Sequence, residues 1–254
     1  MEQKVLSLFK SHYSIGRSIL TLEKAGESEE SGPDSIIDLA LKHNLKQVFL
    51  VEDGFSGFLE AHNNCNAAGL QLIFGLRLTF CKDLTVKDEE SLKSNAKYVI
   101  QIKNSAGYKR LIRIFSKAAT DGFYYEPRMD FKTLKEYWSE ADLQLCVPFY
   151  DSFLFNNSLT MGCCIPDFTF ATPVFFEEDN ELPFDFLVKN RIKEFCGDKH
   201  KVIPAKSIFY NLRADFTSWQ VLKSISARTS LDCPNLNHAN STEFSVESWT
   251  EVNR

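Results

Sequence analysis

The alternation of short apolar runs with amphipathic segments is the feature that most constrains the fold of this chain. The runs that predict strands lie at 5–9, 47–54, 70–80, 97–104, 143–149, 171–178 and 200–210. Apolar residues recur at helical spacing in four segments between them, at 34–44, 57–69, 105–122 and 182–195. Strands that alternate with helices over residues 1–254 predict a single α/β domain with a largely parallel sheet or barrel.

The composition agrees with a folded domain and excludes several classes of protein. The chain is 44% hydrophobic and contains 22 Phe, which predicts a well-filled interior. An acidic segment at about 24–34 carries Gly and Pro and predicts an exposed loop. The net charge of −5 disfavours a stand-alone nucleic-acid-binding protein, so DNA is expected to be contacted only indirectly.

The cysteines and the hydropathy pattern indicate the compartment. Seven Cys occur without a Cys-x-x-Cys pair, which is typical of reduced thiols rather than of a disulfide framework. The adjacent pair Cys163-Cys164 is expected to be buried or partly buried, with a redox or metal role as the alternative. No apolar run approaches the length needed to span a bilayer. We therefore expect a cytoplasmic protein without a membrane partner.

Chemistry in such folds is expected where strands end and loops begin. Around those ends lie Lys10, His12, Glu52, Asp53, Arg77, Phe149, Ser207 and Phe209. His12, in a Ser-His-Tyr-Ser context, is the first candidate for a catalytic or metal-binding side chain.

Several stretches resemble the polymerase-and-histidinol-phosphatase (PHP) domain that opens bacterial DNA polymerase III alpha subunits. The first is "FKSHYSIGRSIL", and the second runs from "ALKHNLKQVFLVEDG" to "LIFGLRL". The most specific is "NSAGYKRLIRIFSKAATDGFYYEPRMDFKTL", because Gly-Phe-Tyr-Tyr-x-Pro-Arg is peculiar to the polymerase branch of the family. The resemblance extends to "VIPAKSIFYNLRADF" and implies a distorted seven-stranded β/α barrel of the TIM-like type.

Active members of that family hold a cluster of zinc or manganese ions on about nine His, Asp, Glu and Cys side chains, which activates water against a phosphoester. The resemblance places the ligand positions on residues that mostly cannot bind a cation: Leu8, Lys10, Arg17, Asp53, Arg77, Phe149, Ser207 and Phe209. Of these, only Asp53 retains a ligating group, and His12 falls beside the motif. The resemblance therefore implies a degenerate site with no catalytic residue, no metal and no cofactor.

Three of these positions carry cations, namely Lys10, Arg17 and Arg77, whereas Glu52 and Asp53 are acidic. We expect an ion-pair network among Lys10, Arg17, Glu52, Asp53 and Arg77 to replace the metal as an electrostatic staple. The alternative is that the metal site was lost and that its positions then accepted any residue that kept the protein soluble, without forming a network.

Two further features could contact a partner. Lys109, Arg113 and Lys117 recur every four residues with Arg110 beside them, and this basic stripe faces either DNA, an acidic partner or only solvent. The aromatic residues of "GFYYEPR" either dock onto another domain or pack in the core.

Three functions remain open. The leading hypothesis is a catalytically inactive PHP-like domain of a bacterial or phage C-family replicative polymerase, which scaffolds the polymerase domains or subunits and docks a proofreading exonuclease. The end at "SVESWTEVNR" favours a fragment of a longer DNA-directed DNA polymerase or a split gene. The second hypothesis is a metal-dependent 3′–5′ exonuclease or phosphoesterase that uses zinc or manganese on His12, Glu52 and Asp53. A regulatory decoy that competes for polymerase partners is the third.

Overall fold

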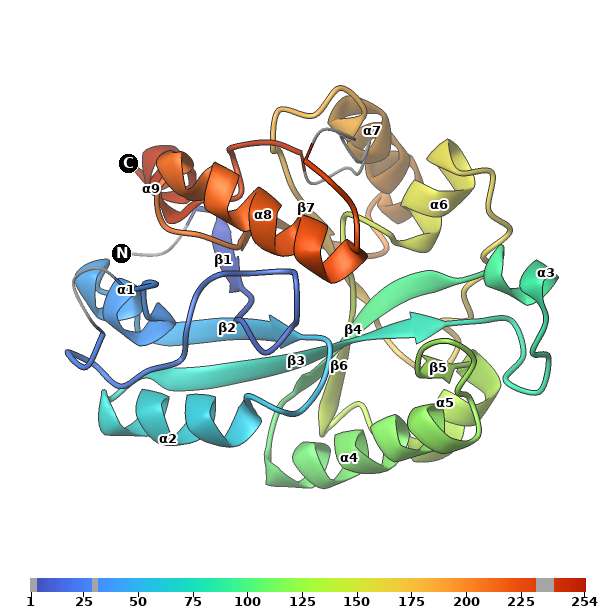
Figure 1. The fold of residues 1–254 in the computed structure, drawn as a ribbon. Coiled ribbons are helices and arrows are strands. Elements are labelled where there is room, and N and C mark those ends of the chain that lie inside the picture. The colour runs from blue at the N-terminus through green and yellow to red at the C-terminus, as the bar shows by residue number, and fades with distance from the viewer. Residues whose placement is uncertain (1–3, 29–31, 232–239) are drawn as a thin grey trace. The chain divides into compact units, whose positions relative to one another are not determined.

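Strands and helices alternate through most of the chain, as the apolar pattern predicts (Figure 1). The structure is a computed structural model that describes residues 4–28, 32–231 and 240–254. Its contacts divide the chain into two compact units. The first unit contains residues 1–74, 178–185 and 204–254, and the second contains residues 75–177 and 186–203.

The first unit is built around a parallel group of strands. β1 (Leu6–Phe9) pairs in parallel with β2 (Gln47–Glu52) on one side and with β8 (Lys201–Ile208) on the other. Its helical elements are α1 (Ile36–Lys42), α2 (Phe58–Ala67), the 3₁₀ turn η1 (Arg213–Asp215), α8 (Phe216–Ala227) and α9 (Val246–Asn253). The register aligns Leu8 with both Phe49 and Ser207.

The second unit contains the strands β3 (Gln71–Phe80), β4 (Ala96–Ile102), β5 (Arg128–Met129), β6 (Leu143–Val147) and β7 (Val174–Glu177). Its helices are α3 (Glu89–Leu92), α4 (Ser105–Thr120), α5 (Phe131–Tyr137), α6 (Phe153–Leu159) and α7 (Asp185–Cys196). β4 runs antiparallel to β3 and β6, whereas β6 and β7 are parallel. The short connection from β3 to β4 carries only the one-turn helix α3, so no full crossover helix returns the chain to a parallel strand.

The fold class is the one predicted, a mixed α/β barrel with seven main strands. The two-residue strand β5 is an addition that pairs in parallel with β3. The unit boundaries fall inside β3 and β8. None of the helices in the described ranges is both long and apolar enough to cross a membrane.

Local sequence signals account for several element ends. Ser35 caps α1, because its hydroxyl accepts a hydrogen bond from the Ile37 amide at 3.1 Å. α2 is followed by Gly69 with a φ of +70°, in the left-handed region that glycine favours. The buried face of α4 contains Leu111, Ile114 and Ala118, whereas Phe115 is only half-buried.

The many phenylalanines fill the interior, as the composition predicts. In the second unit the ring of Phe80 lies 4.9 Å from Tyr98 and 4.9 Å from Phe131, and Phe153 contacts Phe168 at 5.9 Å. The contacts of Phe80 with Tyr98 and of Phe153 with Phe168 are edge-to-face, and such contacts add about 1 kcal/mol each to the burial of apolar area. The described parts of the acidic loop at 24–34 are mostly exposed, as expected, and residues 29–31 lie outside the described residues.

Candidate functional site

An ion pair lies at the ends of β1 and β2 in the first unit. The Lys10 ammonium donates to the Asp53 carboxylate, with Nζ 2.9 Å from Oδ1. The Lys10 side chain is only 7% exposed, whereas that of Asp53 is 36% exposed. Arg17 approaches the other Asp53 oxygen, with Nε 4.0 Å from Oδ2. The structure thus brings two of the predicted network cations, Lys10 and Arg17, to the carboxylate of a third network residue, Asp53.

Glu52 precedes Asp53 at the end of β2 and is fully buried. One of its carboxylate oxygens accepts a hydrogen bond from the Ser11 amide at 2.8 Å, and the other accepts from the Ser14 hydroxyl. Ser14 Oγ in turn accepts from the Asp53 amide at 3.0 Å. The Glu52 carboxylate therefore ties the end of β2 to the loop that follows β1.

The protonation of Glu52 is set mainly by its burial. Removal of the carboxyl from water raises its pKa above the usual range, while the charge of Lys10 and the hydrogen bonds from Ser14 and Ser11 oppose the rise. The group is thus less acidic than an ordinary glutamate, although its hydrogen-bond donors favour the charged form.

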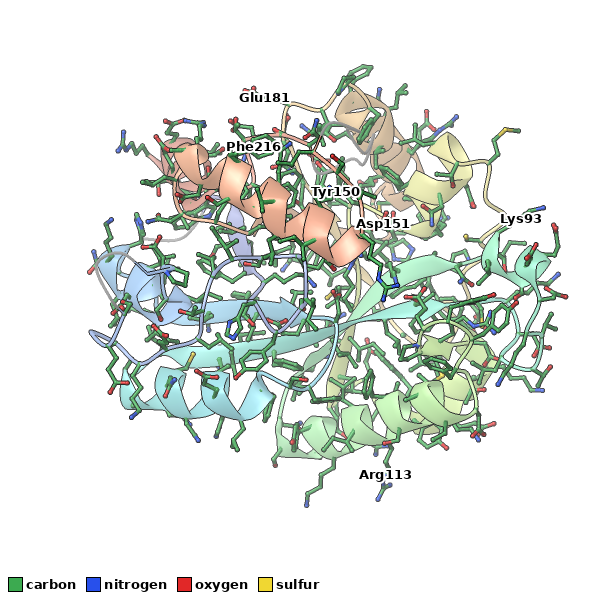
Figure 2. All side chains as sticks on the ribbon, in the orientation of Figure 1. Lys93, Arg113, Tyr150, Asp151, Glu181 and Phe216 are labelled. Atoms are coloured by element: carbon green, nitrogen blue, oxygen red, sulfur yellow. The ribbon has the colours of Figure 1, made fainter. Side chains whose placement is uncertain are left out.

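Arg77 lies on β3 in the second unit and pairs with a residue that the sequence did not single out. Its Nη2 donates to Asp151 Oδ2 at 2.5 Å, and the two side chains are 12% and 27% exposed. Asp151, labelled in Figure 2, follows β6 and has a φ of +59°. Its carbonyl accepts a hydrogen bond from the Lys97 amide at 2.7 Å, so its backbone position is fixed.

The remaining predicted positions are occupied by packing residues or by neutral hydrogen-bonding groups. Leu8 on β1 and Phe149 after β6 are buried, and the Phe149 ring meets Tyr150 edge-on at 4.9 Å. Phe209 stacks on Trp219 and on Phe244 at centroid distances of 5.9 and 5.2 Å. The side chains of Leu8, Phe149 and Phe209 carry no atom that could bind a metal ion.

Ser207 on β8 binds a buried carboxylate instead of a metal. Its amide and hydroxyl donate to Glu178 at 2.9 and 2.8 Å. Burial raises the pKa of Glu178, and the bonds from Ser207 and Asn180 oppose this effect. Glu178 was not predicted, although its position directly after β7 places it at a strand end.

A comparison with protein families matches residues 28–164, more than half of the chain, to the PHP domain. The chain belongs to the PHP domain family. Over 105 residues, 40% of this chain, it is 30% identical to the DNA polymerase III subunit alpha of Borreliella burgdorferi. Over 112 residues, 41% of the chain, it is 27% identical to the same subunit of Aquifex aeolicus. These matches cover 9% and 10% of the two relatives, so the chain spans a small part of their length.

The residues of this PHP domain do not fit a metal cluster. Leu8 and Phe149 offer no ligating atom, and Lys10 places an ammonium beside the carboxylate of Asp53. Within the part of the chain that the structure describes, no three His, Cys, Asp or Glu side chains are arranged to hold a metal ion. His12 is exposed, and its ring packs at 4.3 Å on that of Tyr13.

The predicted basic stripe is divided between paired and exposed cations. Arg110 Nε donates to Asp142 at 2.8 Å, and Lys117 pairs with Asp121 at the end of α4. Lys109 and Arg113 are exposed, and Figure 2 shows Arg113 projecting from α4. Two of the four cations on this PHP domain helix are therefore paired within their own unit, and the other two are exposed.

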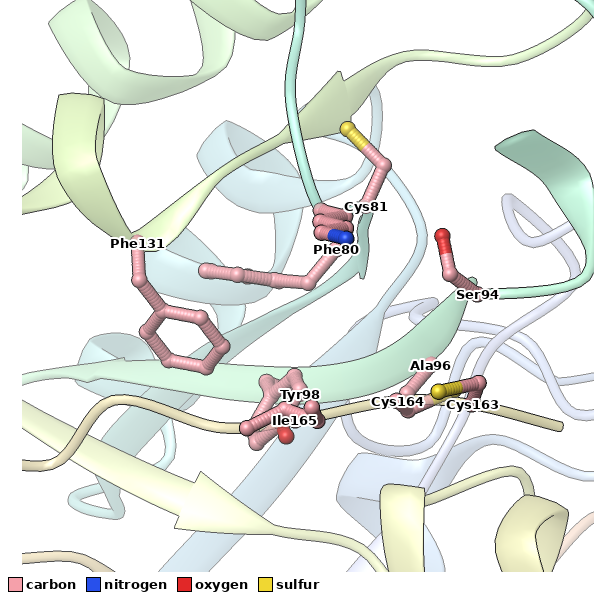
Figure 3. A pocket seen from close by; sticks show the side chains of 10 residues that line it. Phe80, Cys81, Ser94, Ala96, Tyr98, Phe131, Cys163, Cys164 and Ile165 are labelled. Carbon is pink, nitrogen blue, oxygen red and sulfur yellow. The ribbon is translucent and has the colours of Figure 1, made fainter.

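Cys163 and Cys164 line a small cavity in the second unit of the PHP domain. Figure 3 shows the rings of Phe80, Tyr98 and Phe131 around the same space. Cys164 is buried and donates to the Asn95 carbonyl at 3.1 Å, and burial raises the pKa of its thiol to about 11. Cys163 is exposed, which differs from the expectation of at least partial burial for both thiols.

Proposed function

We propose that this chain is a catalytically silent PHP domain with a structural role in a replicative DNA polymerase. The observation that supports the proposal is that positions which the resemblance assigns to metal ligands hold a buried Leu8, a buried Phe149 and a Lys10 paired to Asp53. Activation of water for phosphoester cleavage needs about three protein ligands around a metal with an open position. The residues at these positions offer no such set.

The ion pair at the former site supports a structural role. A metal cluster joins strand ends by bridging their negative charges, and a buried ammonium among carboxylates performs part of that electrostatic task. Lys10 links β1 to the end of β2 through Asp53, and Arg17 adds a second cation to the same carboxylate. In the second unit, Arg77 links β3 to Asp151. We propose that these pairs hold the loops in place of the metal.

The matched relatives support the place of this domain in a polymerase. Both are DNA polymerase III alpha subunits. We propose that the chain scaffolds the other polymerase domains or subunits in the cytoplasm, and that it offers a docking surface for a proofreading exonuclease. In this role it contacts DNA only through its partners.

A nuclease assay tests the silent site. The purified chain is incubated with single-stranded and 3′-mismatched DNA in zinc or manganese, beside an Asp53→Ala variant. We expect equal background cleavage by the two proteins. Metal-dependent cleavage that Asp53→Ala removes would refute the proposal and favour the exonuclease built on His12, Glu52 and Asp53.

A binding assay tests the structural role. The chain is immobilised and exposed to the purified polymerase and exonuclease subunits of its own organism, one at a time. Retention of either subunit is the expected result. The decoy hypothesis predicts in addition that the free chain lowers polymerase activity in a reconstituted reaction.

A further inference from the structure

A short turn joins α4 to β5 (Figure 1), and two large aromatic side chains on it are exposed. Phe123 is 50% exposed and Tyr125 is 76% exposed. Tyr124 between them is half-buried, and its ring contacts that of Tyr125 at 4.7 Å. Rings left in water forgo the free energy of burial, about 25 cal/mol for each Å² of apolar surface. A pair of exposed rings on one short turn therefore calls for an explanation.

The backbone of this turn is held in an uncommon conformation. Tyr125 has a φ of +62°, in the left-handed region that costs an L-residue about 1 kcal/mol or more. The Tyr124 amide donates to the Glu126 carbonyl at 3.1 Å across it. Gly122 is required at the start of the turn, because a Cβ there would lie 2.0 Å from the carbonyl oxygen of Arg128.

The Arg128 side chain holds the turn in place through its hydrogen bonds. This side chain is fully buried, and Nε donates to the Gly122 carbonyl at 3.3 Å. Its other nitrogens donate to Ser91 Oγ at 3.1 Å and to the Val86 carbonyl at 3.0 Å. The guanidinium also lies 5.0 Å from the centre of the Tyr124 ring. A turn held this way is organised before any partner arrives, which lowers the entropy lost on binding.

Two exposed carboxylates without an ion pair among the described residues lie near the turn, with the exposed Lys87 next to them in sequence. Asp88 and Glu89, at the start of α3, lie in the segment between Val86 and Ser91, and both of these residues accept hydrogen bonds from the Arg128 side chain that holds the turn. Both carboxylates are exposed. The nearby ion pairs are Lys93 with Glu90, Lys97 with Glu126, and Lys117 with Asp121, whose pKa Lys87 also lowers. Asp88 and Glu89 have no ion pair within the described residues.

We propose that Phe123, Tyr125, Asp88 and Glu89 form a docking surface for an extended, arginine-bearing segment of a partner protein. Guanidinium groups stack on aromatic faces and pair with carboxylates, so one arginine side chain can use both features of this surface. A nucleic acid backbone fits less well, because its phosphates would approach the two carboxylates. The proposal rests on the proposed docking function and assigns it to a surface and a chemistry.

Fluorescence anisotropy of the full chain with a labelled peptide of Gly-Pro-Arg repeats tests the proposal. A Gly-Pro-Glu peptide and an oligothymidylate of matching length are the competing probes. We expect the arginine peptide to bind, and the Phe123→Ala/Tyr125→Asn double variant to bind about tenfold more weakly. Glu89→Lys should weaken binding by about fivefold.

The variants are chosen so that folding does not confuse the result. Asn tolerates a positive φ, so Tyr125→Asn removes the ring and keeps the conformation of the turn. The thermal unfolding midpoint of the variant checks that it is folded. Phe186→Ala removes a ring that is 70% exposed on α7 and should leave binding unchanged. Equal binding of the arginine peptide by the double variant and the wild type would refute the proposed docking surface. Tighter binding of the oligothymidylate than of the arginine peptide would also refute it.

The outcome is separable from that of the proposed function. Failure of the peptide to bind, together with a silent nuclease assay, refutes this surface and leaves the silent PHP domain standing. Metal-dependent cleavage that depends on Asp53 refutes the silent site whichever way the peptide behaves.

Discussion

Removal of the Asp53 carboxylate is the substitution that most directly probes the proposed electrostatic staple. Two unit charges 2.9 Å apart attract by roughly 6 kcal/mol at an effective dielectric constant of about 20. Dehydration of the Lys10 ammonium, whose side chain is 7% exposed, offsets most of this attraction. We therefore expect a coupling free energy of about 2 kcal/mol between Lys10 and Asp53, and a loss of about 3 kcal/mol of unfolding free energy in Asp53→Ala.

A double-mutant cycle measures that coupling. Wild type, Asp53→Ala, Lys10→Met and the double variant are unfolded in urea at neutral pH, with the fluorescence of the three Trp as the signal. Because Met at position 10 needs no counter-charge, the double variant should be more stable than Asp53→Ala alone.

An exposed ion pair provides the matched control for this cycle. Lys24 and Glu27 are 3.6 Å apart with side chains 61% and 63% exposed, and their coupling should stay below about 0.5 kcal/mol. If the coupling free energy of Lys10 and Asp53 is as small as that of the control pair, the proposal that this ion pair stabilises the fold in place of a metal is refuted.

Three further predictions concern groups elsewhere in the fold. Because the folded-state pKa of Glu52 is raised, this carboxyl keeps its proton in the folded chain at pH values above 4.5 at which the unfolded chain has lost it. The stabilisation that Glu52 contributes is therefore present at low pH and is lost as the pH rises through the folded-state pKa. Urea unfolding across that range should therefore show the stability of the wild type falling relative to Glu52→Gln, and a rising difference would contradict the raised pKa. Gly122→Ala should cost roughly 3 kcal/mol in thermal unfolding, because its Cβ would meet the Arg128 carbonyl at 2.0 Å, and a change near zero would mean that the turn adjusts freely. In a Cys233→Ser background the exposed Cys163 should react first with a thiol reagent, and Cys163→Ser should remove this fast phase.

Much of the fold was predictable because its signals are local. The apolar runs at β2, β3 and β6 are long enough to identify strands, and Ser35 and Gly69 mark helix ends through their own backbone chemistry. α4 was predicted over nearly its whole length, because its apolar stripe repeats with the period of a helix. The antiparallel setting of β4 was not predicted, since pairing direction depends on contacts between segments distant in sequence.

The site was predictable in its residue types and not in its contacts. The sequence showed cations beside carboxylates, which suggested pairing between Lys10 and Asp53, and the two are hydrogen-bonded. It did not indicate Asp151 as a partner of Arg77 or Glu178 as a partner of Ser207, because each partner lies on another strand end. The two adjacent carboxylates that follow the apolar run of β7 are the signal that would have indicated Glu178. Domain number stays a prediction, since one domain was expected and the contacts group into two units.

Metal binding by the whole chain tests the central claim most directly. The protein is treated with a chelator, dialysed, and titrated with zinc or manganese in a calorimeter, with elemental analysis of the recovered material. We expect no stoichiometric binding that depends on Asp53, because Lys10 already neutralises this carboxylate, and because Leu8 and Phe149, which the resemblance places at ligand positions, carry no ligating atoms. Stoichiometric binding in the wild type that is lost in Asp53→Ala would contradict the account.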